Sequence, residues 1–446
     1  MSIFKAYDIR GIVGKELDED LAHNIGRGFA TLLKPKTVVV ARDMRPHSPG
    51  LSAALVKGLT KQGVNVIDIG RASTPMCYFA NGTFGADASV MITASHNPGE
   101  YNGFKLCRAD AVPISGQTGI KDLETIVLDE SFDEPADEPG TVDERDVTEA
   151  YTKRIQSYAD IKKPLNVCVD FANAMGIAEM EALKGLFSYD EMFGEYDGSF
   201  PNHEANPLDE STFDSLTEKV QSGSYDFGIA FDGDADRVGF VDENGKIISM
   251  DMITALIAEA LLQKLAPQPA GEKGVVFYDL RSSKAVKELI EENGGEARMC
   301  RVGHAFIKAQ MREANAVFAG ELSGHYYFRE NFFTESSALA VIFIANLVSA
   351  SEKSLSELVA PIRKYFASGE INSKVKNPAD VFAKVRSAYP DAHTFELDGL
   401  SVEIEDWWFN VRMSNTEPLC RLNLEAPTQE KMESKRDELL ELIRSC

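Results

Sequence analysis

The apolar residues of this chain follow two repeating patterns, one helical and one typical of buried strands. Helical spacing first relates five apolar residues, Leu17, Leu21, Ile25, Phe29 and Leu32. The run TVVVA at 37–41 follows, and its continuous β-branched residues predict a strand buried in a parallel sheet. A second helix through Leu51, Leu55 and Leu59 leads to the strand VNVIDIG at 64–70. This order predicts a βαβ unit.

Two later segments repeat the same order of strand and helix. One begins at NVCVDFANAMG (166–176), and the other at VVFYDLRSSKAVKELIEENGG (275–295), followed by ARMCRVG. We therefore predict three related α/β units, each a parallel sheet with helices on its faces. Parallel strands place their C-terminal loops along one edge of a sheet, where ligands usually bind.

The pattern changes from about Tyr365 onward. Short alternating runs, EINSKV, HTFELDGLSVEI, WWFNVRMS and LCRLNLEA, predict strands, and 429–444 predicts a helix. The predicted fold class is α/β, with three related mixed or parallel α/β domains and a smaller C-terminal α+β domain around a central cleft. The predicted domains are 1–141, 142–248, 249–364 and 365–446. An acidic stretch at 129–149 is expected to be a solvated connection.

Composition narrows the class of protein. A chain of 446 residues exceeds one hydrophobic core, so roughly three or four domains are expected. The net charge of −24 disfavours nucleic acid and anionic membrane as partners, and an anionic substrate would need basic residues gathered locally. Six scattered cysteines without a CxxC pair suggest neither disulfides nor zinc. No secretory signal or long apolar span is evident, so a cytoplasmic protein is expected.

The first candidate for chemistry is Ser95, in the loop TASHNP that follows the apolar run ASVMI. A polar, sharply turning loop at the end of a strand is a usual place for functional residues. A serine in a loop more often forms a local turn or cap. A serine hydrolase is disfavoured because no GxSxG motif surrounds Ser95. His96 should diverge from Ser95 if the backbone there is extended.

The second candidate is the run DGDADR, with Asp232, Asp234 and Asp236 at alternate positions. Three carboxylates this close repel one another unless a hard cation lies between them, and Mg²⁺ suits a site completed by phosphate oxygens. An exposed acidic turn is the ordinary alternative. A Ca²⁺ loop of the EF-hand kind is a further alternative, since Glu243 stands at its twelfth position. That loop needs glycine at its sixth position, where this chain has Arg237.

Two cations and two further loops complete the candidates. Lys105 in YNGFKL and Arg10 in YDIRG would each, taken alone, be solvated surface cations. The loop GELSGH carries a carboxylate, a hydroxyl and an imidazole that suit sugar hydroxyls, from Glu321, Ser323 and His325. The loop RMSNTEP combines a guanidinium with neutral donors, as a phosphate site does, from Arg412, Ser414, Asn415 and Thr416.

Taken together, the loops from YDIRG to RMSNTEP resemble the α-D-phosphohexomutase superfamily over nearly the whole chain. The resemblance implies that Ser95 carries a phosphoryl group and that Mg²⁺ binds to Ser95, Asp232, Asp234 and Asp236. It further implies that GELSGH holds sugar hydroxyls and that RMSNTEP holds the phosphate that is not transferred. Tyr7 is expected among the substrate contacts. Relatives often carry aspartate after the sugar loop, whereas this chain has FFTESS, with Glu335 as the nearest acid.

Within the superfamily, GEINSKV and GELSGHYYF are most similar to the phosphomannomutases, while Leu322 disfavours a phosphoglucosamine mutase. The implied reaction interconverts mannose 6-phosphate and mannose 1-phosphate, for GDP-mannose synthesis, through a hexose 1,6-bisphosphate that also serves as activator. Alternatives are a phosphoglucomutase, a bifunctional mutase, a phosphoserine-dependent phosphatase and a Ca²⁺-binding module. The expected partner is a phosphorylated hexose, and the expected state is a monomer or small homo-oligomer. The expected catalytic residues are Ser95, His96, Lys105, Arg10, Arg237, His304 and His325, with Lys105, His304 and His325 as candidate general bases.

Overall fold

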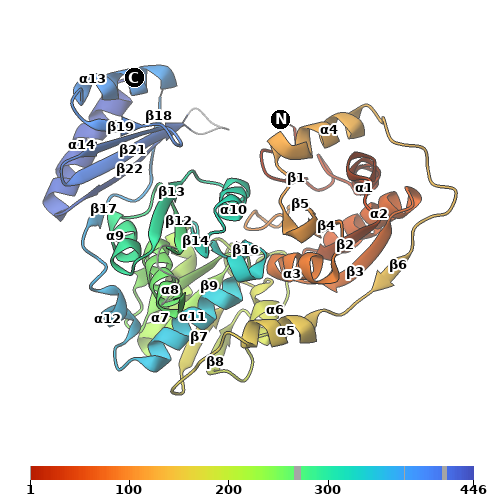
Figure 1. The fold of residues 1–446 in the computed structure, drawn as a ribbon, viewed down its shortest axis with the longest axis horizontal. Coiled ribbons are helices and arrows are strands. Elements are labelled where there is room, and N and C mark those ends of the chain that lie inside the picture. Colours follow the sequence, from red (N-terminus) through yellow and green to blue (C-terminus); the bar gives the residue numbers. More distant parts are fainter. Residues whose placement is uncertain (1, 266–272, 376, 414–418) are drawn as a thin grey trace.

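The structure is a computed structural model, and it describes residues 2–265, 273–375, 377–413 and 419–446. Figure 1 shows the N-terminal domain at one end of the molecule and the C-terminal domain at the other, with two α/β domains between them. Three of the domains are α/β and the last is α+β, as the sequence predicts.

The first domain is a mixed six-stranded sheet in the order β1-β5-β4-β2-β3-β6. Strands β2, β3, β4 and β6 run parallel, while β5 is antiparallel to both β4 and β1. Strand β6 lies within the acidic connection and extends this sheet past the expected boundary at 141/142. The elements are β1 (Ile9–Ile12), α1 (Glu19–Leu33), β2 (Thr37–Arg42), α2 (Ser48–Lys61), β3 (Asn65–Arg71), α3 (Thr74–Phe84), β4 (Ala88–Ile92), β5 (Tyr101–Arg108), α4 (Lys121–Leu128) and β6 (Val142–Glu144).

The second domain has a five-stranded sheet in the order β11-β10-β9-β7-β8. Strands β8 and β9 flank β7 in parallel, and β10 and β11 continue the sheet antiparallel. The elements are α5 (Thr148–Gln156), β7 (Asn166–Asp170), α6 (Gly176–Glu181), β8 (Ser188–Met192), α7 (Asp214–Ser222), β9 (Phe227–Phe231), β10 (Val238–Asp242) and β11 (Ile247–Ile248).

The third domain repeats this topology in the order β13-β12-β14-β15-β16. Strands β13 and β14 flank β12 in parallel, and β15 and β16 are antiparallel. The elements are α8 (Met250–Leu265), β12 (Val275–Asp279), α9 (Lys284–Glu292), β13 (Glu296–Cys300), α10 (His304–Glu313), β14 (Phe318–Gly320), β15 (Tyr326–Phe328), β16 (Thr334–Glu335), α11 (Ser337–Ala350) and α12 (Leu355–Val359). In the first domain, the strands β3-β2-β4-β5-β1 have the same arrangement, which confirms the expected repeat.

The fourth domain is an antiparallel sheet with two helices. Its strands follow the order β17-β22-β21-β20-β19, and β18 also pairs with β22. The elements are β17 (Phe366–Ala367), β18 (Ile371–Lys374), α13 (Pro378–Ala388), β19 (His393–Phe395), β20 (Leu400–Ile404), β21 (Trp407–Met413), β22 (Leu419–Ala426) and α14 (Gln429–Arg444).

Hydrophobic packing divides the molecule unevenly. One core of buried residues runs through the first three domains, joining Val39 and Phe79 to Phe231 and Phe343. A second core lies within the first domain, and a separate core lies wholly within the fourth. In the described part of the chain, no helix combines the length and apolar character that crossing a bilayer requires.

Candidate active site

The three α/β domains each carry one predicted site loop at the same place in the sheet. Each loop connects the last parallel strand to the first antiparallel strand. Residues 93–100 join β4 to β5, 232–237 join β9 to β10, and 321–325 join β14 to β15. The repeated topology therefore presents the serine, the aspartates and the GELSGH loop from equivalent positions.

Ser95 lies at the contact between the first and second of these loops. Its side chain is buried, and its hydroxyl donates a 2.8 Å hydrogen bond to Asp232 Oδ2. The two loops also pack backbone against backbone, because a methyl group added at Gly233 would lie 2.2 Å from the carbonyl oxygen of Ser95. The serine and the acidic loop, 137 residues apart in the chain, therefore form one site.

The expectation that His96 diverges from Ser95 is wrong. His96 Nδ1 lies 3.3 Å from the Ser95 hydroxyl oxygen. The expectation assumed an extended backbone, whereas Ser95 has a left-handed φ of 51°. Burial lowers the pKa of His96 well below its ordinary value, and the charge of Arg237 acts in the same direction.

Arg45 fixes the shape of the serine loop, and sequence reasoning missed it. Its buried guanidinium donates four hydrogen bonds of 2.6–3.0 Å to backbone carbonyls, those of Ser95, Asn97, Pro98 and Tyr101. Asp43 pairs with the same guanidinium at 3.2 Å. The available signal was the position of Arg45 just after the predicted strand at 37–41, on the edge where ligands bind.

The three aspartates form a compact group of buried carboxylates. One oxygen from each of Asp232, Asp234 and Asp236 lies within 4.8 Å of the others. Asp234 Oδ1 is buried without a hydrogen-bond or ion-pair partner in the described structure. Burial raises the pKa of Asp232 well above its ordinary value, and the charges of Asp234 and Asp236 raise it further. Carboxylates that repel one another and leave an oxygen of Asp234 free suit Mg²⁺, so these residues fit the expected metal.

Lys105 is a buried cation of this group and not the solvated one that it would be in isolation. Its Nζ lies 2.5 Å from Asp234 Oδ2 and 2.5 Å from Asp236 Oδ2. Burial acts to lower the pKa of Lys105, but Asp234 and Asp236 raise it above its ordinary value. Lys105 is therefore held as an ammonium.

Arg10 reaches the serine loop from the N-terminal segment. Its guanidinium donates to Ala94 O at 3.2 Å and to Asn97 Oδ1 at 2.6 Å, and Asp8 accepts from its Nε at 2.7 Å. Arg237 approaches the site from the acidic loop, with its Nε 4.0 Å from Asp232 Oδ2. Basic residues are thus gathered around the site, as an anionic substrate would require.

His325 connects the GELSGH loop to the aspartates. Its Nε2 lies 3.3 Å from Asp236 Oδ1, and its Nδ1 lies 3.0 Å from Glu321 Oε2. Burial acts to lower the pKa of His325, but Asp236 and Glu321 raise it to about 9. Ser323 Oγ is 2.9 Å from the same Nδ1. Glu321 Oε2 also accepts a hydrogen bond from the Tyr327 hydroxyl, so in this structure the Glu321 carboxylate holds the side chains of Tyr327 and His325 in place.

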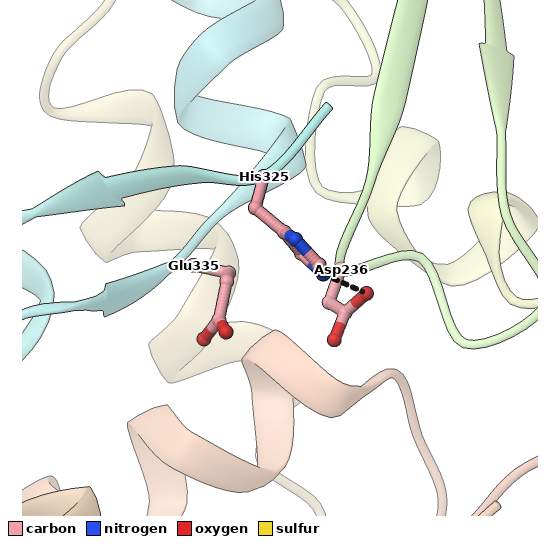
Figure 2. A group of neighbouring side chains, drawn as sticks. All are labelled: Asp236, His325 and Glu335. Atoms are coloured by element: carbon pink, nitrogen blue, oxygen red, sulfur yellow. Dashed lines mark ion pairs between the residues drawn. The ribbon is translucent and has the colours of Figure 1, made fainter. Parts of the chain in front are cut away.

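A second group of possible metal ligands lies beside the first: Asp236, His325 and Glu335 (Figure 2). Figure 2 links His325 to Asp236 as an ion pair and shows Glu335 on an adjacent segment without such a link. The ammonium of Lys308 is 2.6 Å from Glu335 Oε2, which neutralises this carboxylate. Glu335 therefore belongs to a buried ion pair.

Tyr7 and His304 are adjacent to each other on the third-domain side of the site. Their rings meet edge to face with centroids 5.6 Å apart. His304 Nδ1 lies 3.7 Å from Glu335 Oε1. Burial lowers the pKa of His304 well below its ordinary value, with Lys308 acting in the same direction.

Arg412 lies in the fourth domain among carboxylates. Glu370 accepts a hydrogen bond from its Nη2, and Asp398 lies 3.7 Å from its Nη1. Arg421 and Arg281 also approach Glu370, at 3.6 and 4.0 Å. The remaining predicted phosphate contacts, Ser414, Asn415 and Thr416, lie outside the described residues.

Comparison with known proteins agrees with this arrangement. The four domains of the phosphoglucomutase/phosphomannomutase family match residues 1–134, 148–245, 249–365 and 370–442. A phosphomannomutase of Methanocaldococcus jannaschii is 42% identical over 450 residues, covering 99% of this chain and 98% of its own length.

Solved structures show the same fold. The crystal structure of a phosphoglucomutase/phosphomannomutase family protein of Burkholderia thailandensis superposes with a TM-score of 0.90 at 32% identity, covering 99% of this chain and 97% of its own. A more distant neighbour, N-acetylphosphoglucosamine mutase of Aspergillus fumigatus in complex with GlcNAc-6P and magnesium, shares the fold with a TM-score of 0.62 at 14% identity, covering 98% of this chain and 94% of its own. This chain belongs to the phosphoglucomutase/phosphomannomutase family.

Proposed function

We propose that this protein is a phosphomannomutase that interconverts mannose 6-phosphate and mannose 1-phosphate. The observation that carries the proposal is the Ser95 hydroxyl, buried 2.8 Å from Asp232 and beside two further carboxylates. A nucleophilic hydroxyl next to a Mg²⁺ donor set suits phosphoryl transfer, where positioning and charge provide most of the catalysis.

The first transfer starts from phospho-Ser95. The free hydroxyl of the bound sugar phosphate attacks phosphorus, a new P–O bond forms to the sugar, and the bond to Ser95 Oγ breaks. The product is a hexose 1,6-bisphosphate, which turns end for end and returns its other phosphoryl group to Ser95. In the first transfer the sugar hydroxyl loses its proton and Ser95 Oγ gains one. In the second, the Ser95 hydroxyl attacks the other phosphorus and loses its proton, and the departing sugar oxygen gains one, so both steps balance and no inorganic phosphate is released.

The residues around Ser95 have distinct roles in this proposal. Bound Mg²⁺ on Asp232, Asp234 and Asp236 would neutralise a phosphoryl oxygen. Arg10 and Arg237 add positive charge beside the serine loop, and Arg45 holds the carbonyls that set the position of Ser95. Lys105 supplies charge and not basicity, because two aspartates hold it as an ammonium.

We assign His325 to the return of the proton and not to its removal, because, despite burial, Asp236 and Glu321 raise its pKa to about 9 and so hold it as an imidazolium that can donate to the departing oxygen. Glu321 orients the imidazole through Nδ1, which leaves Nε2 directed toward the Asp236 side of the site. His304 is the general base that we favour, because burial and the charge of Lys308 lower its pKa and leave its imidazole neutral, while the nearby Glu335 is already paired with Lys308. His96 lies 3.3 Å from the Ser95 hydroxyl oxygen, so it faces the nucleophile and not the sugar hydroxyl that must lose a proton in the first transfer.

The far phosphate of the substrate is assigned to the fourth domain, through Arg412 with Ser414, Asn415 and Thr416. Arg412 supports this assignment, because its buried guanidinium lies where the third and fourth domains meet, beside Glu370, which Arg281 of the third domain also approaches. Glu321 and Ser323 are assigned to sugar hydroxyls. The product must bind in two orientations, so strong phosphate contacts and permissive sugar contacts are expected.

Phosphorus NMR tests the reaction class. Mannose 1-phosphate incubated with enzyme, Mg²⁺ and a catalytic amount of hexose 1,6-bisphosphate should give mannose 6-phosphate. Inorganic phosphate in its place would identify a phosphatase and reject the mutase. Ser95→Ala should abolish turnover without loss of fold, while Ser131→Ala, at an exposed serine, should not.

A phosphoglucomutase is the second candidate, because mannose and glucose differ only at C2. The kcat/KM values for mannose 1-phosphate and glucose 1-phosphate, measured side by side, decide between the two. Equal values would indicate a bifunctional mutase.

A further inference from the structure

Glu179 is a buried carboxylate that the proposed reaction does not use. It lies on α6 of the second domain and is fully buried. In the described part of the chain, it forms no ion pair with a lysine, arginine or histidine. Burial of a carboxylate without a cation costs free energy of folding unless several hydrogen-bond donors contact it, so the donors around Glu179 must account for its burial.

Its hydrogen-bond partners come from different domains. Ser73, the N-cap of α3 in the first domain, donates to Oε1. Tyr151 on α5 donates to Oε2 at 2.8 Å. Ser337 at the start of α11 in the third domain lies 3.5 Å from Oε2, and the backbone N–H of Ala338 also contacts this carboxylate.

Two helix N-termini therefore meet at one carboxylate. Helix α3 has 11 residues and α11 has 14, and the positive end of each helix dipole faces Glu179. Among the described residues, burial raises the pKa of Tyr151 and of Tyr196, and the charge of Glu179 acts on both hydroxyls in the same direction. The carboxylate thus joins elements of the first and third domains to the second.

The same helix ends hold the acidic loop. Thr74, next to Ser73, donates through its backbone to Asp234 O at 3.0 Å and through its hydroxyl to Asp234 Oδ2. Ser337 donates to Ala235 O at 2.7 Å. Ala235 has a left-handed φ of 59°, a strained conformation that the surrounding structure must maintain.

We infer that Glu179 is a positioning residue for the metal site: it holds the starts of α3 and α11 in place, and these two helices fix Asp234 and Ala235 in the metal-binding loop. The inference rests on the proposed metal role of Asp232, Asp234 and Asp236. Residues that orient metal ligands without touching the metal commonly change metal affinity by about 10–100-fold.

The test is calorimetric titration of Mg²⁺ into the unloaded enzyme, with kcat and KM measured alongside. Glu179→Ala should raise the Kd for Mg²⁺ by about tenfold and lower kcat at limiting Mg²⁺, with little change in KM for the sugar phosphate. Glu179→Gln keeps the side-chain length and an acceptor oxygen, so it should restore most of the affinity. Glu181→Ala is the matched control, because Glu181 lies exposed on the same helix.

The titration distinguishes a failure of the proposed metal role from a failure of the inference about Glu179. Wild-type enzyme that binds no Mg²⁺ would overturn both the proposed metal role and this inference. Wild-type enzyme that binds Mg²⁺ no more tightly than folded Glu179→Ala would overturn the inference alone. Should Glu179→Ala not fold, Ser337→Ala decides, since it removes only the hydroxyl between Glu179 and Ala235; an unchanged Kd there would also overturn the inference.

Discussion

Single residues in this site act through the backbone as much as through their side chains. The φ of 51° at Ser95 turns its hydroxyl toward Asp232, and the guanidinium of Arg45 stabilises that turn by binding the carbonyls around it. A flat guanidinium can bind several carbonyls at once, whereas an ammonium is a single point charge. The position of the nucleophile therefore depends on a residue that need not touch the substrate.

Arg45→Lys should separate positioning from substrate binding. The lysine keeps the charge opposite Asp43 but cannot reach all four carbonyls, so the serine loop loosens. We expect kcat to fall about a hundredfold with little change in KM, because a misplacement of about 1 Å has an effect of this size. Arg42→Lys is the control, since Arg42 is partly exposed and pairs with Asp68 at 3.5 Å. An equal loss of kcat in both variants would contradict the positioning role.

Glu179 also predicts a pH dependence of stability. Burial raises its pKa to about 7 from an ordinary value of 4.5. Between these values the folded protein retains a proton that the unfolded chain releases. The contribution of Glu179 to the free energy of unfolding is therefore fully present below pH 4.5 and is lost as the pH rises through 7. The loss from this one group is about 3 kcal/mol and is complete above about pH 8.

Glu179→Gln should remove this contribution. Denaturant unfolding at pH 5 and pH 8 measures it, as the difference between the two pH values in wild type minus the same difference in the variant. Glu181→Gln should behave as wild type, because Glu181 is exposed. Identical pH dependence in Glu179→Gln and wild type would show that the Glu179 carboxyl titrates normally.

At the scale of helices, strands and loops, the repeated topology places the three site loops at equivalent positions. Each α/β domain places its site loop between a parallel and an antiparallel strand, so three copies of one architecture supply three different chemistries. The first two loops meet so closely that only glycine fits at 233. Contact between these elements therefore sets the distance between the nucleophile and the aspartates.

Gly233→Ala should move the two loops apart. The added methyl group would meet the Ser95 carbonyl at 2.2 Å, and backbone cannot yield as a flexible side chain does. We expect a large fall in kcat, of about a hundredfold, and weaker Mg²⁺ binding by calorimetry. Gly116→Ala is the control, because its nearest neighbour would lie 3.5 Å away. A Gly233→Ala enzyme with normal kcat would show that the loops need not touch.

At the scale of the whole molecule, the fourth domain stands apart from the other three. Its core includes no residue of the first three domains, which share a core among themselves. Polar contacts join it to the third domain, such as Glu425 accepting from Lys284 N at 3.0 Å and Arg281 near Glu370. Interfaces of this polar kind permit domains to move and to unfold separately.

The two tryptophans allow this separation to be measured. Trp407 and Trp408 are the only tryptophans of the chain, and both lie on β21 of the fourth domain. In urea, we expect the tryptophan emission to report a transition whose midpoint differs from that of far-UV circular dichroism, which reports all four domains. Coincident midpoints would instead indicate that the four domains unfold as one cooperative unit.

Much of the fold could be predicted from the sequence because local patterns determine it. The β-branched runs predict β2 and β3, and the apolar spacing near the C-terminus predicts α14 at 429–444, where the structure has it. The repeat of strand and helix predicts three related domains, and their topology confirms it. The antiparallel strands within those domains were less evident, since a short apolar run does not reveal the direction of its neighbour.

The sequence also predicted a candidate site whose members the structure brings together, since Ser95, Lys105 and the three aspartates stand in segments whose composition suits phosphate and a metal. It could not show that Lys105 bridges Asp234 and Asp236, that His96 turns toward Ser95, or that Arg45 and Glu179 support the loops from behind. Apart from the turn at Ser95 and His96, most of these contacts join residues far apart in the chain, such as Lys105 and Asp236, which are 131 positions apart, or Glu179 and Ser337, which are 158 apart. Distances between such residues depend on how whole domains pack, so only the tertiary structure decides them.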